Sequence, residues 1–557
     1  MARGQASRSG GRGARAPAPA PSSREADLAR LQSLLARSPG DARILNNIAV
    51  TLRALGRQDE ARAHLERARA IDPDGPDVNH NLGNLLSDAG SLDEAVLAYR
   101  RALAARPDAP RTSIQLAGAL QRLGRKAEAL QATADALSMR PDDAELRNAH
   151  GALLYEMKRP EAALAHLAYA MRLSPSLRAA RANAGLAANA LGMFERIVAS
   201  ARAVLAREPD CAATHAQLGQ ALVSLGRLDE ARAHVDAALA LAPDDLEALM
   251  ARSRLLFLSG DWEAAWPAYS VRWRRADNPP PRTKVPQWQL GEDPAGLSIF
   301  VHAEQGLGDT INFCRYLPVL AARARHVRFG CQEPLVDLLR ASLPGVEVVP
   351  HPQGPGQCAR IVPLLDLPMR LGMHDPWWPG TPYLRAEGPP PLSWPEDGRL
   401  AVGMAWAGNP DHGNDRFRSI AAERLVFLAG DPRARVVSLQ RQPPDAVRER
   451  IDAAGLMLDA GDRLHSFSDS AALVERLDLV VTVDTSLAHL AGAMGKPVWM
   501  LLPSAPDWRW GIEGEATPWY PSMRIFRQRV HGDWSAPLAE LAAAFDEILG
   551  RGARGHA

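Results

Sequence analysis

The sequence predicts a multidomain protein in which an all-α array of helical repeats precedes an α/β region of two doubly wound lobes. Three observations support this division of the 557 residues. Prolines recur at intervals of 34 residues from Pro39 to Pro243, and all 13 tryptophans lie at or after Trp262. From about residue 297, apolar strand-like runs alternate with segments of helical length. We therefore expect two differently built halves.

The overall composition is that of an ordinary globular protein, with 46% hydrophobic and 23% charged residues. A net charge of +1 does not favour a nucleic-acid-binding protein. No run of 18 apolar residues is present, so we expect no membrane span. The cysteines are too few and too scattered for a disulfide framework or a zinc site, which fits a reducing, cytoplasmic location. They are Cys211, Cys314, Cys331 and Cys358.

The first 24 residues are expected to form a disordered tail. Gly, Pro, Ser and Arg dominate this stretch and cannot bury enough apolar surface to fold. It also lacks the apolar segment of a secretory signal. Residues 25–38 resemble half of one repeat and are expected to cap the array.

Three series of residues share the 34-residue period. Each proline is expected to end the second helix of a unit, because it lacks an N–H group. The glycines suit a left-handed turn between two helices, and the alanines allow close helix contact. The glycine series is Gly56, Gly90, Gly124, Gly192, Gly226 and Gly260, with Lys158 as its exception; the alanine series is Ala61, Ala95, Ala129, Ala163, Ala231 and Ala265, interrupted by Ile197.

This period resembles the tetratricopeptide repeat, a helix–turn–helix unit. We count seven full repeats across about 42–277, so the array is expected to cover residues 25–277. Such arrays stack into a superhelix with a concave groove.

The sixth position of each repeat would face that groove in this family. Five of the seven residues there carry an amide, namely Asn47, Asn81, Gln115, Asn183 and Gln217. An amide both donates and accepts, so it can hold a peptide backbone without reading side chains. The pattern resembles the asparagine ladder of the protein O-GlcNAc transferase. The alternative is that these amides bond the neighbouring helix.

The second half is expected to contain two parallel sheets covered by helices. A linker over 278–296 would precede the first lobe, 297–392, and the second lobe would cover 393–545, with a tail over 546–557. The expected strands are 297–303, 326–331, 346–350, 400–408, 435–440, 456–460, 477–484 and 496–503; the expected helices are 311–324, 334–343, 468–477 and 486–495. Two such Rossmann-like lobes would enclose a cleft.

A first candidate site segment follows the strand at 297–303. Gly306 and Gly308 would let backbone approach a ligand, with Glu304 on the same loop. Asp309 begins a helix, where backbone N–H groups stabilise its ionised form. It could then accept a proton from a docked hydroxyl, or it could merely cap the helix.

Two further segments follow strands in the second lobe. Gly408 and Asn409 form a loop that leads to Arg418, whose guanidinium suits a diphosphate. The alternative is a solvated basic loop. Asp484, Thr485 and Ser486 lie where a strand meets a helix, with backbone and hydroxyl donors for phosphate. His489 is one turn further along the helix, on the same face as Thr485, where a core histidine is the alternative.

These segments together resemble the heptosyltransferase family. DTSLAHLAGAMGKPV is similar to the nucleotide-sugar signature of that family, and GLGDTINFCRYLP is similar to its N-terminal segment, whose aspartate is the proposed base. The string PDWRWG completes a likeness, over about residues 260–545, to bacterial proteins that fuse tetratricopeptide repeats to a glycosyltransferase domain.

The resemblance implies a GT-B fold and a role for each segment. Asp309 would be the general base, and the first lobe would hold the acceptor. Arg418 would neutralise the donor diphosphate, although the heptosyltransferases have lysine there. The 484–486 segment would hold phosphate, and His489 the ribose or phosphate.

The implied protein is a metal-independent, inverting glycosyltransferase with no cofactor other than its nucleotide-diphosphate sugar. No D-x-D occurs after residue 297, in agreement with this class. The repeats would capture a protein acceptor for O-glycosylation, and fusions that modify flagellin offer an analogy. One alternative is a lipid-linked or polysaccharide acceptor, and another is a non-catalytic scaffold that binds nucleotide.

Two groups of aromatic residues have separate expected roles. Trp508, Trp510, Trp519 and Tyr520 could stack on a base or sugar, with core packing as the alternative. The residues around the last repeat are expected to seal it against the catalytic half. They are Trp262, Trp266, Tyr269 and Trp273.

Overall fold

The computed structural model describes residues 23–275, 279–281, 283–410, 413–441, 443, 445, 447–449 and 457–551. The chain forms two compact units, residues 1–187 and 188–557. Most of the expected N-terminal tail lies outside the described residues, as do residues 552–557 of the expected C-terminal tail. None of the helices in the described part has the length and apolar character that crossing a bilayer requires.

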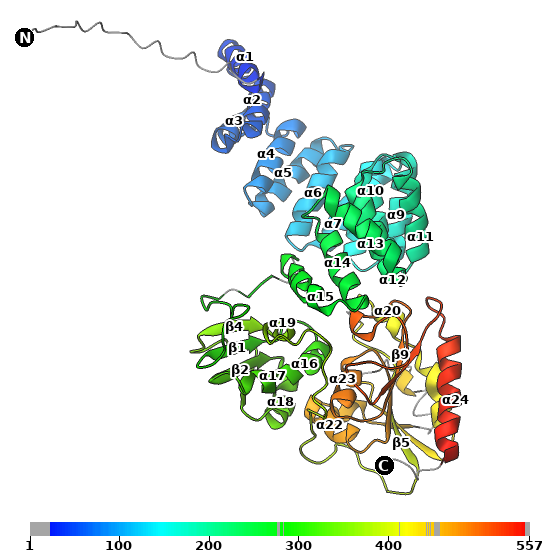
Figure 1. The fold of residues 1–557 in the computed structure, drawn as a ribbon. Coiled ribbons are helices and arrows are strands. Elements are labelled where there is room, and N and C mark those ends of the chain that lie inside the picture. Colours follow the sequence, from blue (N-terminus) through cyan, green and yellow to red (C-terminus); the bar gives the residue numbers. More distant parts are fainter. Residues whose placement is uncertain are drawn as a thin grey trace, which may run out of the picture. The chain divides into compact units, whose positions relative to one another are not determined.

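The first half of the chain consists of helices only, as the repeat pattern predicts (Figure 1). Helix α1 (Ser23–Arg37) stands before seven helix pairs, in agreement with a half-repeat followed by seven repeats. The pairs are α2 (Ala42–Ala54) with α3 (Gln58–Ile71), α4 (Pro76–Asp88) with α5 (Leu92–Ala105), α6 (Pro110–Arg122) with α7 (Lys126–Met139), α8 (Ala144–Glu156) with α9 (Pro160–Leu173), α10 (Arg178–Ala190) with α11 (Phe194–Leu205), α12 (Ala212–Ser224) with α13 (Leu228–Leu241), and α14 (Leu246–Leu258) with α15 (Trp262–Tyr269).

The periodic residues have the positions that their chemistry suggests. Every glycine of the series has a positive φ, between 66° and 82°, in the turn within a helix pair. Lys158 occupies the same turn with a φ of 59°, a conformation that costs a side-chain-bearing residue about 1–2 kcal/mol. The periodic alanines Ala61, Ala95, Ala129 and Ala163 are fully buried between helices.

The α/β region holds two all-parallel sheets. The first has the order β3-β2-β1-β4, built from β1 (Ser298–His302), β2 (His326–Cys331), β3 (Val346–Pro350) and β4 (Arg360–Pro363). The second has the order β10-β9-β8-β5-β6-β7. Its strands are β5 (Leu400–Ala405), β6 (Ala434–Ser438), β7 (Met457–Asp459), β8 (Leu479–Val483), β9 (Val498–Leu502) and β10 (Met523–Arg527).

Each sheet has a point where the chain reverses its direction of winding. In the first sheet the chain proceeds from β1 to β2 and β3, then places β4 on the other side of β1. In the second, β5 is followed outward by β6 and β7, and β8 returns to the free side of β5. Open α/β sheets bind ligands outside the carboxyl ends of the strands at such switch points. The topology therefore predicts that a ligand would bind at the carboxyl ends of β1, β5 and β8.

Helices cover these sheets and complete the second half. They are α16 (Leu307–Phe313), α17 (Leu317–Ala321), α18 (Val336–Ser342), α19 (Leu367–Arg370), α20 (Asp415–Arg418), α22 (Phe467–Val474), α23 (Ser486–Ala493) and α24 (Ser535–Arg551). The last helix includes residues 546–551, which the sequence assigns to a tail, and buries Leu549 against the second sheet. Within the expected linker, Trp288 is buried and its N–H bonds the Ile361 carbonyl at 2.8 Å, so the chain runs along β4.

The last repeat shares a hydrophobic core with both lobes. Phe257 of α14 stacks on Trp508, with ring centroids 4.0 Å apart and planes 15° apart. Trp266 of α15 contacts Phe313 of the first lobe edge to face, at 5.8 Å between centroids. Trp262 packs against Trp508 and Trp519 in the same core. These direct contacts meet the expectation that the aromatic residues seal the last repeat against the α/β region.

Candidate active site

All three candidate segments lie at the switch points of the sheets. The Asp309 segment follows β1, the Arg418 loop follows β5, and the 484–489 segment follows β8. Helices α16 and α23, which carry two of these segments, lie side by side across the lobes (Figure 1). A β-carbon at Gly308 would lie 2.8 Å from His489 Cδ2 and 3.6 Å from the Ser486 Cα. Gly308 therefore permits the close contact of two helices, a different use from the approach to ligand that the sequence suggests.

The carboxylate of Asp309 bonds one neighbour in its own loop and one residue far along the chain. Its Oδ2 accepts from the Gly306 N–H at 3.0 Å, which is the capping role considered from the sequence. Its Oδ1 accepts from Nη2 of Arg509, 200 residues further along the chain. The Asp309 side chain is 21% exposed and that of Arg509 is 5% exposed. The candidate base therefore stands at the edge of the core, in an ion pair that connects the two lobes.

Arg509 is the residue that the sequence reasoning missed. Its Nη1 donates to Asp507 Oδ1 at 2.7 Å, and its guanidinium lies over the Trp508 ring at 4.3 Å from the centroid. Burial lowers the pKa of Arg509, but the Asp507 and Asp309 carboxylates outweigh burial and the pKa is raised. A charged residue inside the aromatic string PDWRWG was the available signal, since such a cation needs buried carboxylate partners.

Arg418 is fixed between the two segments of the second lobe. Its Nη1 donates to the Asp484 carbonyl at 2.8 Å, and its Nε donates to Asp415 Oδ1 at 3.2 Å. A β-carbon at Gly408 would lie 2.5 Å from Arg418 Nη2 and from Asp415 Oδ1, so a side chain here would displace the Arg418–Asp415 pair. Asn409 is the next residue of that loop.

Asp484 differs electrostatically from an ordinary aspartate. Burial and the neighbouring Asp507 carboxylate raise its pKa to about 6, although Arg418 acts in the opposite direction. An ionised carboxylate here would repel a phosphate, whereas a protonated one could donate to it. The contribution of Asp484 to an anion site therefore depends on pH in the neutral range.

The remaining residues of this segment begin α23. Thr485 precedes the helix with extended backbone, and its hydroxyl lies 3.3 Å from that of Thr482. Ser486 is the first helical residue. The first N–H groups of an α-helix have no partner within the helix and favour anions. The geometry of the junction is therefore suited to a phosphate.

His489 is buried, and its Nδ1 lies 2.9 Å from the Tyr520 hydroxyl. Its ring packs near Trp510, with centroids 5.0 Å apart. Burial, with the charges of Arg509 and Arg315, lowers its pKa to about 3, so the imidazole is neutral at neutral pH. These contacts are those of the core histidine considered as the alternative.

Glu304 is engaged in a buried ion-pair network. Its two oxygens accept from Arg272 at 2.8 and 3.0 Å, and Arg272 also donates to Asp366 at 2.6 Å. Arg272 belongs to the turn after α15, so the network ties the end of the repeat array to the first lobe. The structure gives Glu304 a structural contact within the expected acceptor loop.

The four aromatic residues at the end of the second lobe are all buried. Exposure is 6% for Trp508, 2% for Trp510 and 0% for Trp519 and Tyr520. They contact each other and the last repeat, and Trp510 and Tyr520 also contact His489, as core packing requires.

The groove amides fall into two groups. Asn81 donates to Asn46 Oδ1 at 2.9 Å, and Asn183 donates to Asn148 Oδ1 at the same distance, each bonding the preceding repeat. Asn47 and Gln115 are exposed, and Gln217 is half-buried. At two of the five positions the amide thus bonds a neighbouring helix. The hypothesis that the groove binds a peptide therefore depends on the exposed amides, Asn47 and Gln115.

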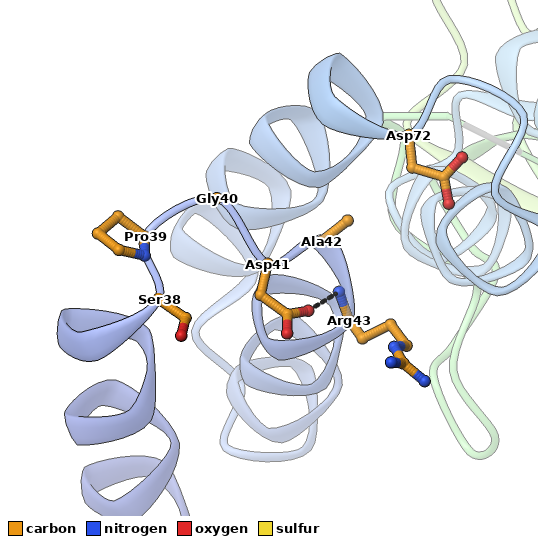
Figure 2. Close-up of a pocket in the computed structure, with 7 residues that line it drawn as sticks. All are labelled: Ser38, Pro39, Gly40, Asp41, Ala42, Arg43 and Asp72. Carbon is orange, nitrogen blue, oxygen red and sulfur yellow. Dashed lines mark hydrogen bonds between the residues drawn. The ribbon is translucent and has the colours of Figure 1, made fainter.

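A surface pocket lies at the turn from α1 to α2, with Asp72 at the end of α3 on its other side, and offers little chemistry (Figure 2). Asp41 Oδ1 accepts from the N–H groups of Arg43 and Ile44, at 2.8 and 3.2 Å, and so caps α2. In the described part of the chain, no three His, Cys, Asp or Glu side chains gather in a way that could hold a metal ion.

Comparison with known families agrees with both halves. Models described as "Tetratricopeptide repeat" match residues 86–153 and 188–255, and a "TPR repeat" model matches 49–90. A model described as "Glycosyltransferase family 9 (heptosyltransferase)" matches residues 465–532. The chain therefore joins tetratricopeptide repeats to a region that matches the glycosyltransferase family 9 model. The matched transferase region contains the 484–489 segment and Arg509.

A curated relative, Protein FlbA of Caulobacter vibrioides, is 26% identical over 333 residues. The match covers 54% of each protein, so the chain spans about half the length of that relative. Among solved structures, the Cut9-Hcn1 hetero-tetramer of the APC/C has 19% identity and a TM-score of 0.36, over 42% of this chain and 46% of the other. YrrB, "a TPR protein with an unusual peptide-binding site", has 18% identity and a TM-score of 0.27, over 40% of this chain and 97% of the other.

Proposed function

We propose that the protein transfers a sugar from a nucleoside-diphosphate sugar to a hydroxyl group of a protein captured by the repeats. The observation that carries this proposal is the meeting of α16 and α23, which brings the segments after β1 and β8 together at the switch points of two sheets. The family 9 match supports the reaction class.

In the proposed reaction, the acceptor hydroxyl attacks the anomeric carbon of the donor sugar. The new C–O bond forms as the bond to the diphosphate breaks, and the electron pair leaves with the nucleoside diphosphate. Asp309 takes the proton of the hydroxyl. Attack opposite the leaving group inverts the anomeric configuration.

The leaving diphosphate needs positive charge as it departs. The N-terminus of α23 at Ser486 and the guanidinium of Arg418 are placed to supply it. Since these groups neutralise the anion, the proposed transfer requires no metal ion. His489 would contribute by holding α23 against α16, because its ring lies against Gly308 and its Nδ1 lies 3.5 Å from Asn312 Nδ2.

The acceptor assignment rests on the repeats. Exposed amides such as Asn47 and Gln115 lie on the first helices of their repeats, where they can bond a peptide backbone. A protein acceptor uses both halves of the chain, which a lipid-linked acceptor would not.

The proposal is tested with the full chain immobilised in lysate, followed by a panel of UDP-, ADP- and GDP-sugars with EDTA present. We expect one donor to produce a mass increase of one sugar on a captured protein, flagellin included among the candidates. The variant Asp309→Asn should capture the same protein without modifying it. Sugar release only to a lipid or polysaccharide fraction would refute the protein acceptor, and dependence on added metal would refute the metal-free mechanism.

A further inference from the structure

Arg509 occupies the centre of the candidate site. It bonds Asp309 of the first lobe, and its charge acts on Asp484 and His489 of the second. Because Gly308 lies against Ser486, the Asp309–Arg509 pair stands beside the N-terminus of α23. The same cation is therefore next to the candidate base and next to the candidate phosphate site.

The guanidinium of Arg509 has one N–H donor that no described residue accepts from. Nη1 and Nη2 bond Asp507 and Asp309, but the buried Nε has no hydrogen-bond partner among the described residues. An unpartnered buried donor is costly, so its presence calls for an explanation such as a ligand. A diphosphate carries several acceptor oxygens and suits the planar guanidinium fork.

The ion pair also conflicts with the proposed role of Asp309. A carboxylate that accepts from a guanidinium is a weaker base, because the cation favours its ionised form. Asp309 is therefore a stronger base for the proton of a hydroxyl once Arg509 has released it. Asp507 can retain Arg509 through Nη1 while Nη2 changes partner.

We propose that Arg509 exchanges partners during the reaction: it holds Asp309 until the donor binds, and then bonds the diphosphate. The exchange neutralises the leaving group and frees Asp309 in one step. Without a donor, Asp309 stays paired with Arg509 and is a weak base. This inference rests on the proposed function and adds a residue that would touch the donor.

The exchange predicts an increase in nucleoside-diphosphate affinity when Asp309 loses its charge. A purely structural role of the ion pair would not predict that increase. If Asp309 competes with the diphosphate for Arg509, removing the charge of Asp309 should strengthen nucleoside-diphosphate binding. We expect Asp309→Asn to bind UDP, ADP or GDP about 5- to 50-fold more tightly than the natural protein, as is typical of coupled neighbours. Arg509→Lys should bind more weakly, and adding Asp309→Asn to it should restore little.

A buried ion pair at the amino ends of β5 and β6, opposite the candidate site, provides the control. Arg435 of β6 is buried and donates to Asp397, which precedes β5, at 2.5 Å. Neither residue approaches the carboxyl ends of the strands. Asp397→Asn and Arg435→Lys should leave nucleoside-diphosphate affinity unchanged while lowering stability.

Calorimetry on the full chain measures all these affinities, with circular dichroism to check folding. An unchanged or weaker affinity in Asp309→Asn, with binding intact in the natural protein, would overturn the exchange and leave the proposed function standing. No binding of any nucleoside diphosphate to the natural protein would overturn the proposed function and the exchange with it. If Arg509→Lys does not fold, Asp309→Asn alone still decides.

Discussion

Asp309 accepts from the Gly306 N–H and from Arg509, and substitution can separate its contribution to stability from the catalytic role proposed for it. Asn keeps the shape and the capping oxygen but is not a base. General-base catalysis is worth about 10²–10⁴-fold, so Asp309→Asn should lower kcat by about that range with a small change in melting temperature. Single-turnover transfer measures the rate, and turnover near that of the natural protein would refute the base assignment.

Asp484 predicts a pH dependence of stability. Its pKa is about 6 in the folded chain, above the usual aspartate value of about 4. The folded state therefore holds the proton more tightly, and its stabilisation is lost as pH rises through about 6. Asp484→Asn cannot ionise, so the variant should gain stability relative to the natural protein at pH 8 and lose that advantage near pH 4. Calorimetric melting at both pH values tests this, and a constant difference would contradict it.

Some of the candidate site residues are indicated by a local sequence pattern, and others depend on contacts between distant parts of the chain. The segments at Asp309, Arg418 and 484–489 could be located from sequence, because each follows an apolar strand and opens a helix. The ion pair with Arg509 could not, since it joins residues 200 positions apart through a fold that no local pattern specifies. The sequence places Glu304 on the same loop as Asp309. In the structure its carboxylate bonds the buried Arg272, a contact that no local pattern indicates.

The contact of α16 with α23 is the element-scale feature on which the site depends. An alanine methyl at Gly308 would meet the His489 ring at 2.8 Å, and overpacking of this kind costs about 1–3 kcal/mol. We expect Gly308→Ala to lower both the melting temperature and the transfer rate. Gly306→Ala is the matched control, because its methyl would approach only the Asp309 carboxylate, at 3.3 Å. Equal melting temperatures for the two variants would show that the helices do not depend on this contact.

The elements themselves were predictable where several independent signals coincide. The repeat helices follow from three series in one register, and strands such as β1 and β8 follow from continuous apolar runs. Two strands were not anticipated: β4 (Arg360–Pro363) has four residues bounded by arginine and proline, and β10 (Met523–Arg527) has arginines at two of its five positions. Their assignment comes from pairing with β1 and β9, which tertiary structure alone provides.

At the scale of the whole chain, composition and packing divide the protein differently. The sequence indicates a boundary near residue 277, where the repeats end. The second compact unit begins at residue 188 and includes the last repeats. Within it, Phe194 of α11 contacts His531 with ring centroids 5.3 Å apart, and Arg254 of α14 donates to the Pro506 carbonyl at 3.1 Å.

This difference predicts how the chain tolerates truncation. A fragment 278–557 would lose α14 and α15 and expose the face of the core that Phe257, Trp262 and Trp266 cover. Large aromatic side chains bury about 150–250 Å² each, so these three leave an apolar patch of about 450–750 Å², at or above the largest that soluble monomers usually expose. The fragment would also lose Arg272, leaving the buried Glu304 and Asp366 carboxylates without their cation. We therefore expect 278–557 to aggregate or melt without cooperativity, whereas 188–557 should melt cooperatively and bind a nucleoside diphosphate as tightly as the full chain. Size-exclusion chromatography, calorimetric melting and titration on both fragments test this. A cooperatively folded 278–557 with full nucleotide affinity would show that the last repeats are an independent domain, and that the boundary indicated by composition is the correct one.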